Sequence, residues 1–228
     1  LYGVQTLRGI ENFSISKFRL SEYPLFIKGL AITKMAAAMA NFELGLLTVE
    51  QKDAIIAACG EILDGKHHDQ FPVDMIQGGA GTTTNMNANE VIANRALELM
   101  GHERGEYQYC SPNDHVNCSQ STNDAYPTAI HIGMYFKHLQ LLPHLEELIA
   151  SFRKKGEEFS QIIKMGRTQL EDAVPMTLGQ TFNGFASILQ DEIAHLNEAA
   201  ADFLVVNMGA TAIGTGICCL LYTSPSPR

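Results

Sequence analysis

The sequence has 228 residues, a formal net charge of −9, 46% hydrophobic residues and 18% charged residues. This is the composition of a globular chain that can bury a core, and its one basic run is Arg153-Lys154-Lys155. Nucleic acid is therefore not expected as a partner, because nucleic-acid surfaces need clustered positive charge.

Neither a membrane span nor a secretory signal is visible. No stretch of about 18 uninterrupted apolar residues is present, so no membrane partner is expected. The opening LYGVQ has neither a basic nor an apolar signal region, and the missing initial Met suggests that the true start lies upstream. The cysteines are odd in number and lack a metal-binding spacing, which indicates reduced thiols and a cytoplasmic location, with a Cys110–Cys118 bridge as the alternative. They are Cys59, Cys110, Cys118, Cys218 and Cys219.

Helical patterns dominate the first half of the chain. A helix is predicted over 24–45, with a proline suited to a first turn and a glycine suited to a stop. A second is predicted over 48–65, opening on a capping box, and a third from about Asn87 to Met100. Extended pieces are predicted only near Ile10–Ser16 and Gln161–Met165.

Two long helices are predicted in the second half. One begins near Asn123 or Asp124 and passes His138, with Pro143 as a kink or break. The other opens on a capping box at Thr177 and runs to Asn207. Its apolar stripe is long enough to need a partner along its length, as in helix bundles that often form between subunits. The stripe consists of Phe182, Phe185, Leu189, Ile193, Leu196, Ala200 and Phe203.

The fold class is therefore mainly α, with long central bundle helices. We expect an N-terminal, mostly helical domain at 1–121 and a partial central bundle domain at 122–217. The last residues, 218–228, read CCLLYTSPSPR and have no helical pattern. They resemble the translated read-through of a sequencing adapter and are expected to be non-native, with a flexible natural tail as the alternative.

Three polar clusters lie in loops ahead of helices, where backbone donors are free. They are residues 77–87, 119–124 and 166–173. The first is glycine-rich but lacks the lysine of a phosphate loop, and a tight turn with capping threonines is the alternative. The second exceeds what a helix cap requires. None contains a Ser-His-Asp arrangement, but their neutral donors suit carboxylates and the negative charge that develops on them.

The histidines favour structural roles over catalysis or metal binding. Adjacent His67 and His68 rarely chelate one ion, so no metal is expected. His115 is expected to stabilise its loop, and His131 and His138 to pack along one helix. No dinucleotide or flavin motif is present, so no cofactor is expected.

Four runs in this order resemble the aspartase/fumarase family: GGAGTTTNMNANEVIANRALELMG, GEYQYCSPNDHVNCSQSTNDAYPTA, KMGRTQLEDAVPMTLGQ and NMGATAIGTG. The resemblance spans about residues 1–217. It implies three helical domains, a homotetramer built on the central bundle, active sites that each draw on three subunits, and a small dicarboxylate as substrate.

Carried over by position, the resemblance implies substrate contacts at three segments. Thr82 and Asn85 match the first, and Thr168 and Gln169 match the third. The second holds one carboxylate and the amino group of aspartate, and matches Ser121, Thr122 and Asn123.

The implied reaction is the reversible deamination of L-aspartate to fumarate through Cβ proton abstraction and an aci-carboxylate intermediate. Gln169 stands where fumarases, and some ammonia-releasing members of the family, have histidine. The glutamine resembles the other ammonia-releasing members and weakens the alternative, fumarate hydration. The family's loop with its base serine should follow Gly216 and is absent, so the catalytic residue is unknown and this chain is expected to be inactive alone. A non-catalytic helical assembly module is the remaining alternative.

Overall fold

The computed structural model describes residues 1–216, which fall into two compact units. Unit 1 consists of Leu1–Met134 with residues 205–216, and unit 2 is Tyr135–Leu204. Helices dominate both units, so the prediction of a mainly α fold is confirmed. The expected non-native segment, 218–228, lies outside the described residues.

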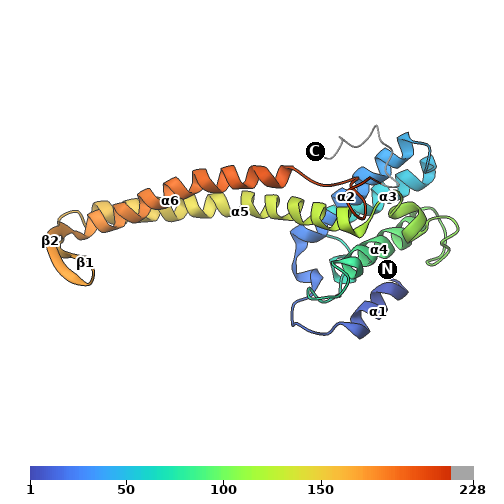
Figure 1. Cartoon of the computed structure of the whole chain (residues 1–228), viewed down its shortest axis with the longest axis horizontal. Helices are drawn as coiled ribbons and strands as arrows, with labels where there is room; N and C mark the ends of the chain where they lie inside the picture. Colours follow the sequence, from blue (N-terminus) through green and yellow to red (C-terminus); the bar gives the residue numbers. More distant parts are fainter. Residues whose placement is uncertain (217–228) are drawn as a thin grey trace. The chain divides into compact units, whose positions relative to one another are not determined.

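Unit 1 contains four whole helices and the beginning of a fifth (Figure 1). The helices are α1 (Val4–Asn12), α2 (Pro24–Glu43), α3 (Val49–Leu63), α4 (Thr82–Leu99) and the first residues of α5 (Thr122–Glu158), with the short turns η1 (Leu20–Glu22), η2 (His68–Gln70) and the π-helical η3 (Pro112–Val116).

Local signals explain most of these helix limits. Pro24 opens α2, and Gly45 follows it with a φ of 73°. Thr48 caps α3 in a capping box with Gln51. The predictions at 24–45 and 48–65 are thus confirmed to within two residues. Helix α4 begins at Thr82, five residues earlier than expected, because the loop before it already turns at Gly81.

The core of unit 1 lies among α2, α3 and α4. Buried aliphatic side chains from all three helices form one cluster, which includes Ile27, Leu30, Ile55, Ile62, Ile92 and Leu97. By length and composition α2 is the one described helix that could cross a membrane, yet half of its apolar window is buried inside this core. Such burial is typical of a core helix in a folded domain.

The expectation of an extended piece at Ile10–Ser16 is wrong, because α1 runs through Asn12. The carboxylate of Glu90, on α4, accepts hydrogen bonds from the backbone N–H groups of Gly3, Gln5 and Thr6 at 2.8–3.0 Å. Free N–H groups at a helix start need such a partner. A residue 84 positions away supplies it, so no local cap announces this helix.

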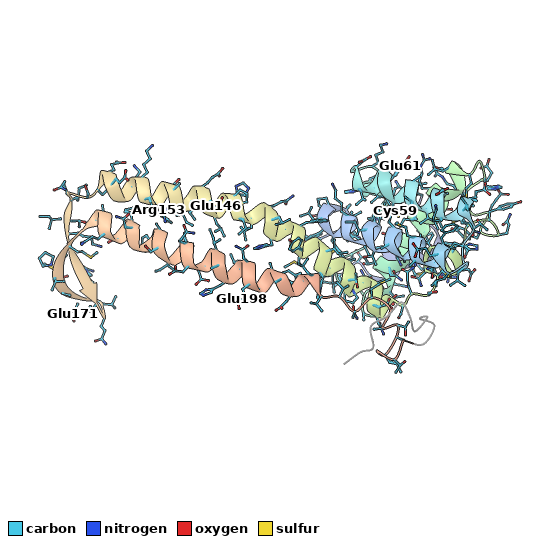
Figure 2. The ribbon with its side chains drawn as sticks, turned by 90° about the horizontal axis from the view of Figure 1, so that it is seen from above. Cys59, Glu61, Glu146, Arg153, Glu171 and Glu198 are labelled. Atoms are coloured by element: carbon cyan, nitrogen blue, oxygen red, sulfur yellow. The ribbon has the colours of Figure 1, made fainter. Side chains whose placement is uncertain are left out.

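Unit 2 is a helical hairpin that ends in a small sheet. The later part of α5 lies beside α6 (Leu178–Ala201) in Figures 1 and 2. Between them four phenylalanine rings pack with centroids 5.5–6.2 Å apart, and His138 bonds Asn197 at 3.0 Å. The rings belong to Phe152, Phe159, Phe182 and Phe185.

Two limits of the long helices differ from expectation. Helix α5 continues through Pro143 without a break, because Pro143 is exposed and water can take the carbonyl that its ring leaves unbonded. Helix α6 ends at Ala201 rather than Asn207 and passes into the 3-10 turn η4 (Asp202–Leu204).

The two strands form one antiparallel hairpin. β1 (Ile163–Thr168) pairs with β2 (Glu171–Thr177), so the extended piece predicted near Gln161–Met165 is confirmed in part. The two-residue turn is Gln169-Leu170, with φ values of 50° and 70°. Both residues therefore lie in the left-handed region that such turns reserve for glycine or asparagine.

The expected domain boundary at 121/122 coincides with the start of α5. The division between the compact units falls later, after Met134. The domain limits 1–121 and 122–217 stay a prediction for the whole protein.

Candidate functional site

The glycine-rich loop before α4 is a strained turn closed by a threonine. Gly79, Ala80 and Gly81 all have positive φ, at 73°, 49° and 93°. The Thr82 hydroxyl donates to the Gly79 carbonyl at 2.7 Å. A Cβ on Gly81 would lie 2.5 Å from the Tyr126 ring, so this position requires glycine.

A pocket of about 480 Å³ lies between this loop and the first turns of α5. Its wall is mostly apolar, and three of its residues, Gln77, Asn123 and Tyr126, carry polar side-chain groups. A mostly apolar wall with a few polar groups is common in small-molecule sites. It is lined by Met75, Gln77, Ala80, Gly81, Asn123, Tyr126, Pro127 and Ile130. Gln77 is fixed to Thr84 by two hydrogen bonds of 2.8 Å.

The second polar cluster begins α5. The Ser121 hydroxyl accepts from the Asn123 N–H at 3.2 Å, and the Ser121 N–H donates to Asp124 Oδ1 at 3.0 Å. Ser121 thus takes the capping role. Thr122 serves another contact, because its Oγ1 accepts from Asn85 Nδ2 at 3.1 Å. This bond joins the first and second predicted segments.

Residues 205–216 return to unit 1 and bond the start of α5. Asn207 Nδ2 donates to the Asn123 carbonyl at 3.0 Å, and Asn123 Nδ2 donates to the Ala212 carbonyl at 2.7 Å. The Asn123 carbonyl is free for this because Pro127, four residues later, has no N–H. The wholly buried Asp124 also accepts from the Thr211 N–H at 2.9 Å.

Behind Asn85 and Thr122 lies a buried polar network. Asn117 Oδ1 accepts from Asn85 Nδ2 at 3.1 Å and from Lys34 Nζ at 2.9 Å. Lys34 Nζ also donates to Gln120 Oε1 at 2.9 Å. Burial lowers the pKa of Lys34 to about 7, and the negative charge of Asp124 opposes this shift.

The structure brings five of the seven sequence-predicted residues together at the starts of α4 and α5. These are Thr82, Asn85, Ser121, Thr122 and Asn123. The other two, Thr168 and Gln169, belong to unit 2, where they are exposed at the tip of the β1–β2 hairpin.

Sequence reasoning missed the residues that support these groups. Lys34 carried a signal, since it is the one charged residue in the apolar run AITKMAAAMA. Asn117 precedes the second polar cluster, which contains Gln120 and Asp124, and only the fold shows that these residues meet Lys34, Asn85 and Thr211.

The remaining polar candidates have structural contacts. His115 Nδ1 accepts from the Ser111 N–H at 2.7 Å, which stabilises the loop as expected. His67 Nε2 lies 2.8 Å from a Glu61 carboxylate oxygen. Among residues 1–216, no group of three or more His, Cys, Asp or Glu side chains is placed to hold a metal ion.

The cysteines that the structure describes, Cys59, Cys110 and Cys118, are free thiols. Burial raises the pKa of both Cys59 and Cys110 to about 12, so neither forms a thiolate near neutral pH. Cys218 and Cys219 lie outside the described residues.

Comparison with known proteins gives a consistent set of relatives. The family described as Lyase matches residues 1–219. The aspartate ammonia-lyase of Pseudomonas canavaninivorans is 59% identical over 95% of this chain and 46% of its own length. That of Escherichia coli K12 is 56% identical over 95% of this chain and 45% of its own length.

Solved structures agree. A fumarate lyase:delta crystallin from Brucella melitensis bound to cobalt has a TM-score of 0.92 and 55% identity, over 95% of this chain and 47% of the other. The class II fumarase of Schistosoma mansoni has a TM-score of 0.86 and 38% identity, over 96% of this chain and 46% of the fumarase chain. The chain spans about half the length of each of these relatives.

Proposed function

The chain belongs to the lyase family, and from this premise we propose that the whole protein deaminates L-aspartate reversibly to fumarate and ammonia. The observation that carries the proposal is the group of hydroxyl and amide side chains that the starts of α4 and α5 bring together beside a pocket. The similarity of the chain to curated aspartate ammonia-lyases supports the choice of L-aspartate as substrate.

The proposed substrate-binding residues follow the chemistry of a dicarboxylate. Helix N-termini carry a partial positive charge that favours anions, and Thr82 and Ser121 stand at two of them. We assign the hydroxyls of Ser121 and Thr122 to the carboxylates, Asn85 to the same group through its bond to Thr122, and Thr82 by its position at the start of α4. Asn123 would bind the amino group.

Thr168 and Gln169 complete the proposed site. We propose that the whole protein is a homotetramer in which each site takes its three polar segments from three subunits. The exposure of both residues at a hairpin tip suits contact with another chain.

The proposed mechanism uses these donors on developing charge. Removal of a Cβ proton places negative charge on the β-carboxylate, forming an aci-carboxylate intermediate that expels ammonia. Preorganised donors stabilise that charge more in the transition state than in the bound substrate. No residue of this chain is assigned as the base. We propose that a serine of the rest of the whole protein supplies it, so the chain alone would be inactive.

Fumarate hydration is the second candidate, because a class II fumarase is among the structural relatives. Its substrate is also a four-carbon dicarboxylate, and the same donors would suit it. Gln169 weakens this candidate, because fumarases, like some aspartases, carry a histidine at this position and other aspartases carry a glutamine.

The test is to offer the whole protein L-aspartate and L-malate separately and to follow fumarate by ultraviolet absorbance. Fumarate and ammonia from aspartate alone are expected. Turnover of malate alone would contradict the deaminase assignment. Turnover of neither substrate would favour the alternative of a non-catalytic helical assembly module.

A further inference from the structure

A single lysine occupies the interior of unit 1. Lys34 lies on α2 with no exposed surface, in a helix whose other buried residues are mainly apolar. Burying a charge is costly unless hydrogen bonds and opposite charge offset the lost hydration. A methionine or leucine here would fill the space without that cost. The position therefore breaks the rule that the rest of α2 follows, and such breaks concentrate at functional sites.

The two hydrogen bonds that the Lys34 ammonium group donates go to the same loop. Both go to the loop just before the second substrate segment, to Asn117 Oδ1 and Gln120 Oε1 at 2.9 Å each. Asn117 also donates from Nδ2 to the Gln120 carbonyl at 3.2 Å, which closes the turn. Lys34 thus ties residues 117–120 to the core helix α2, and Ser121 follows directly.

A second path reaches Thr122. The Asn117 Oδ1 atom that Lys34 binds also accepts from Asn85 Nδ2, and the same Nδ2 donates to Thr122 Oγ1, both at 3.1 Å. The orientation of the Thr122 hydroxyl therefore depends on where Asn117 and Asn85 are held. Because Lys34 is fully buried and both bonds are internal, it does not contact the substrate itself.

We propose that Lys34 is a positioning residue: its ammonium group fixes Asn117 and Gln120, and through Asn117 and Asn85 it sets the geometry of the Thr122 hydroxyl toward the substrate carboxylate. This inference rests on the proposed function. It adds a residue on α2, remote in sequence from all three substrate segments, to the machinery of the site.

The first test is kinetic and uses the whole protein. Lys34→Met is expected to lower kcat/KM about 10²-fold, since misplacement of a reacting contact from a distance costs about that much. Most of the loss is expected in kcat, because Thr122 acts on charge that develops in the transition state. Lys28→Met, on the same helix, is the matched control and is expected to stay within about twofold of the parent.

A double variant separates positioning from general destabilisation. If Lys34 acts through Asn117, then Lys34→Met combined with Asn117→Ala is expected to lose little more than the worse single variant. The proposal would be overturned if the double variant lost kcat/KM by the product of the two single losses. A parent-like kcat/KM in Lys34→Met would also overturn it. Should Lys34→Met not fold, Gln120→Met removes one acceptor at a half-buried position. It is expected to lower kcat/KM about tenfold, and parent-like activity would again overturn the proposal.

A second measurement does not depend on activity. Backbone amide exchange over residues 117–125 is expected to be at least tenfold faster in Lys34→Met than in the parent, with exchange in α3 unchanged. If the parent protein turns over neither aspartate nor malate, the proposed function fails and this measurement alone decides the role of Lys34. Unchanged exchange over 117–125 would then refute it.

Discussion

At the scale of single residues, the side-chain oxygen Oδ1 of Asn117 is the acceptor with the most hydrogen bonds in the candidate site. It accepts from Lys34, Asn85 and Asn89 at 2.9–3.2 Å. The Oδ1 atoms of Asn85 and Asn89 are buried without a partner among the described residues. A network of this kind is sensitive to any change, because a partly satisfied buried polar group is costly.

Replacing Thr122 with alanine removes a hydroxyl that we assign to the substrate carboxylate. Loss of one such donor typically costs about 10²–10³ in rate, so we expect kcat of the whole protein to fall in that range. Steady-state kinetics with L-aspartate measures it, with Thr122→Ser as the variant that keeps the hydroxyl. Turnover close to that of the parent in Thr122→Ala would place the site elsewhere.

The Glu61 carboxylate couples the stability of unit 1 to acid. Hydrogen bonds from Arg95 at 2.6 and 2.8 Å, opposed by burial and joined by a contact with His67, lower the pKa of Glu61 to about 2. Because this pKa lies below the ordinary value of 4.5, the bonds stabilise the fold fully above about pH 4.5. Their contribution is lost as the pH falls toward about 2.

The expected outcome is a thermal midpoint that falls more steeply with acidification in the parent than in Glu61→Gln. Midpoints measured by circular dichroism from about pH 6 to pH 3 provide the comparison. Glu43→Gln, an exposed position on α2, is expected to follow the parent. Parallel curves for the parent and Glu61→Gln would mean that the Arg95 pair contributes nothing.

At this scale the sequence indicated the residues that we propose to contact the substrate, but not the residues that hold them in place. Thr82, Ser121 and Thr122 were accessible because hydroxyls crowd before a helix. Lys34 and Asn117 were not, since they are 83 residues apart and only the packing of α2 against the η3 region makes them partners.

At the scale of elements, helix ends with local caps were predictable and those with distant caps were not. The capping boxes at Thr48 and Thr177 form as their sequences indicate. Helix α1 escaped prediction because Glu90, across the fold, accepts its free N–H groups. The break predicted at Pro143 is absent, since α5 runs through this exposed position, although proline removes one helical hydrogen bond there.

The β1–β2 turn places an exposed leucine where glycine is preferred. Leu170 has a φ of 70° and its side chain is 91% exposed, so little packing offsets the strain. A non-glycine residue in this region lowers the free energy of unfolding by about 1–3 kcal/mol through strain. Glycine relieves the strain, but its greater freedom in the unfolded chain costs about 0.5–1 kcal/mol. We expect Leu170→Gly to stabilise unit 2 by about 1 kcal/mol.

Denaturant unfolding followed by helical signal tests this expectation. Leu170→Ala is the matched control, because it removes the same exposed side chain but keeps the Cβ that causes the strain. An equal gain in both variants would show that the exposed leucine, and not the backbone, is the source of the effect.

At the scale of the whole molecule, unit 2 exposes more apolar surface than a solitary hairpin of helices would need. Phe185 and Ile188 on α6 are 47% and 62% exposed, and Leu141 and Leu148 on α5 are also exposed. Contiguous exposed apolar surface marks contact sites, and long helices bury such stripes in bundles. This is the physical support for the proposed homotetramer.

Sedimentation analysis of the whole protein tests that assembly. Ile188→Glu is expected to shift the protein toward smaller species, because it places a charge in an apolar contact. Glu198→Gln, on the same helix (Figure 2), is expected to leave the distribution unchanged. A parent and an Ile188→Glu variant that both sediment as monomers would remove the basis for sites shared among subunits.

The return of residues 205–216 to the start of α5 has a consequence for how the chain folds during synthesis. Thr211 bonds Asp124 across a separation of 87 residues, and at about 5–20 residues per second a ribosome takes roughly 4–17 s to add them. During that interval residues 1–134 can assemble their core, but Asn123 and Asp124 lack the bonds that Asn207, Thr211 and Ala212 later supply. A nascent chain therefore passes through a state with a packed interior in which the first turns of α5 still lack their final hydrogen-bond partners.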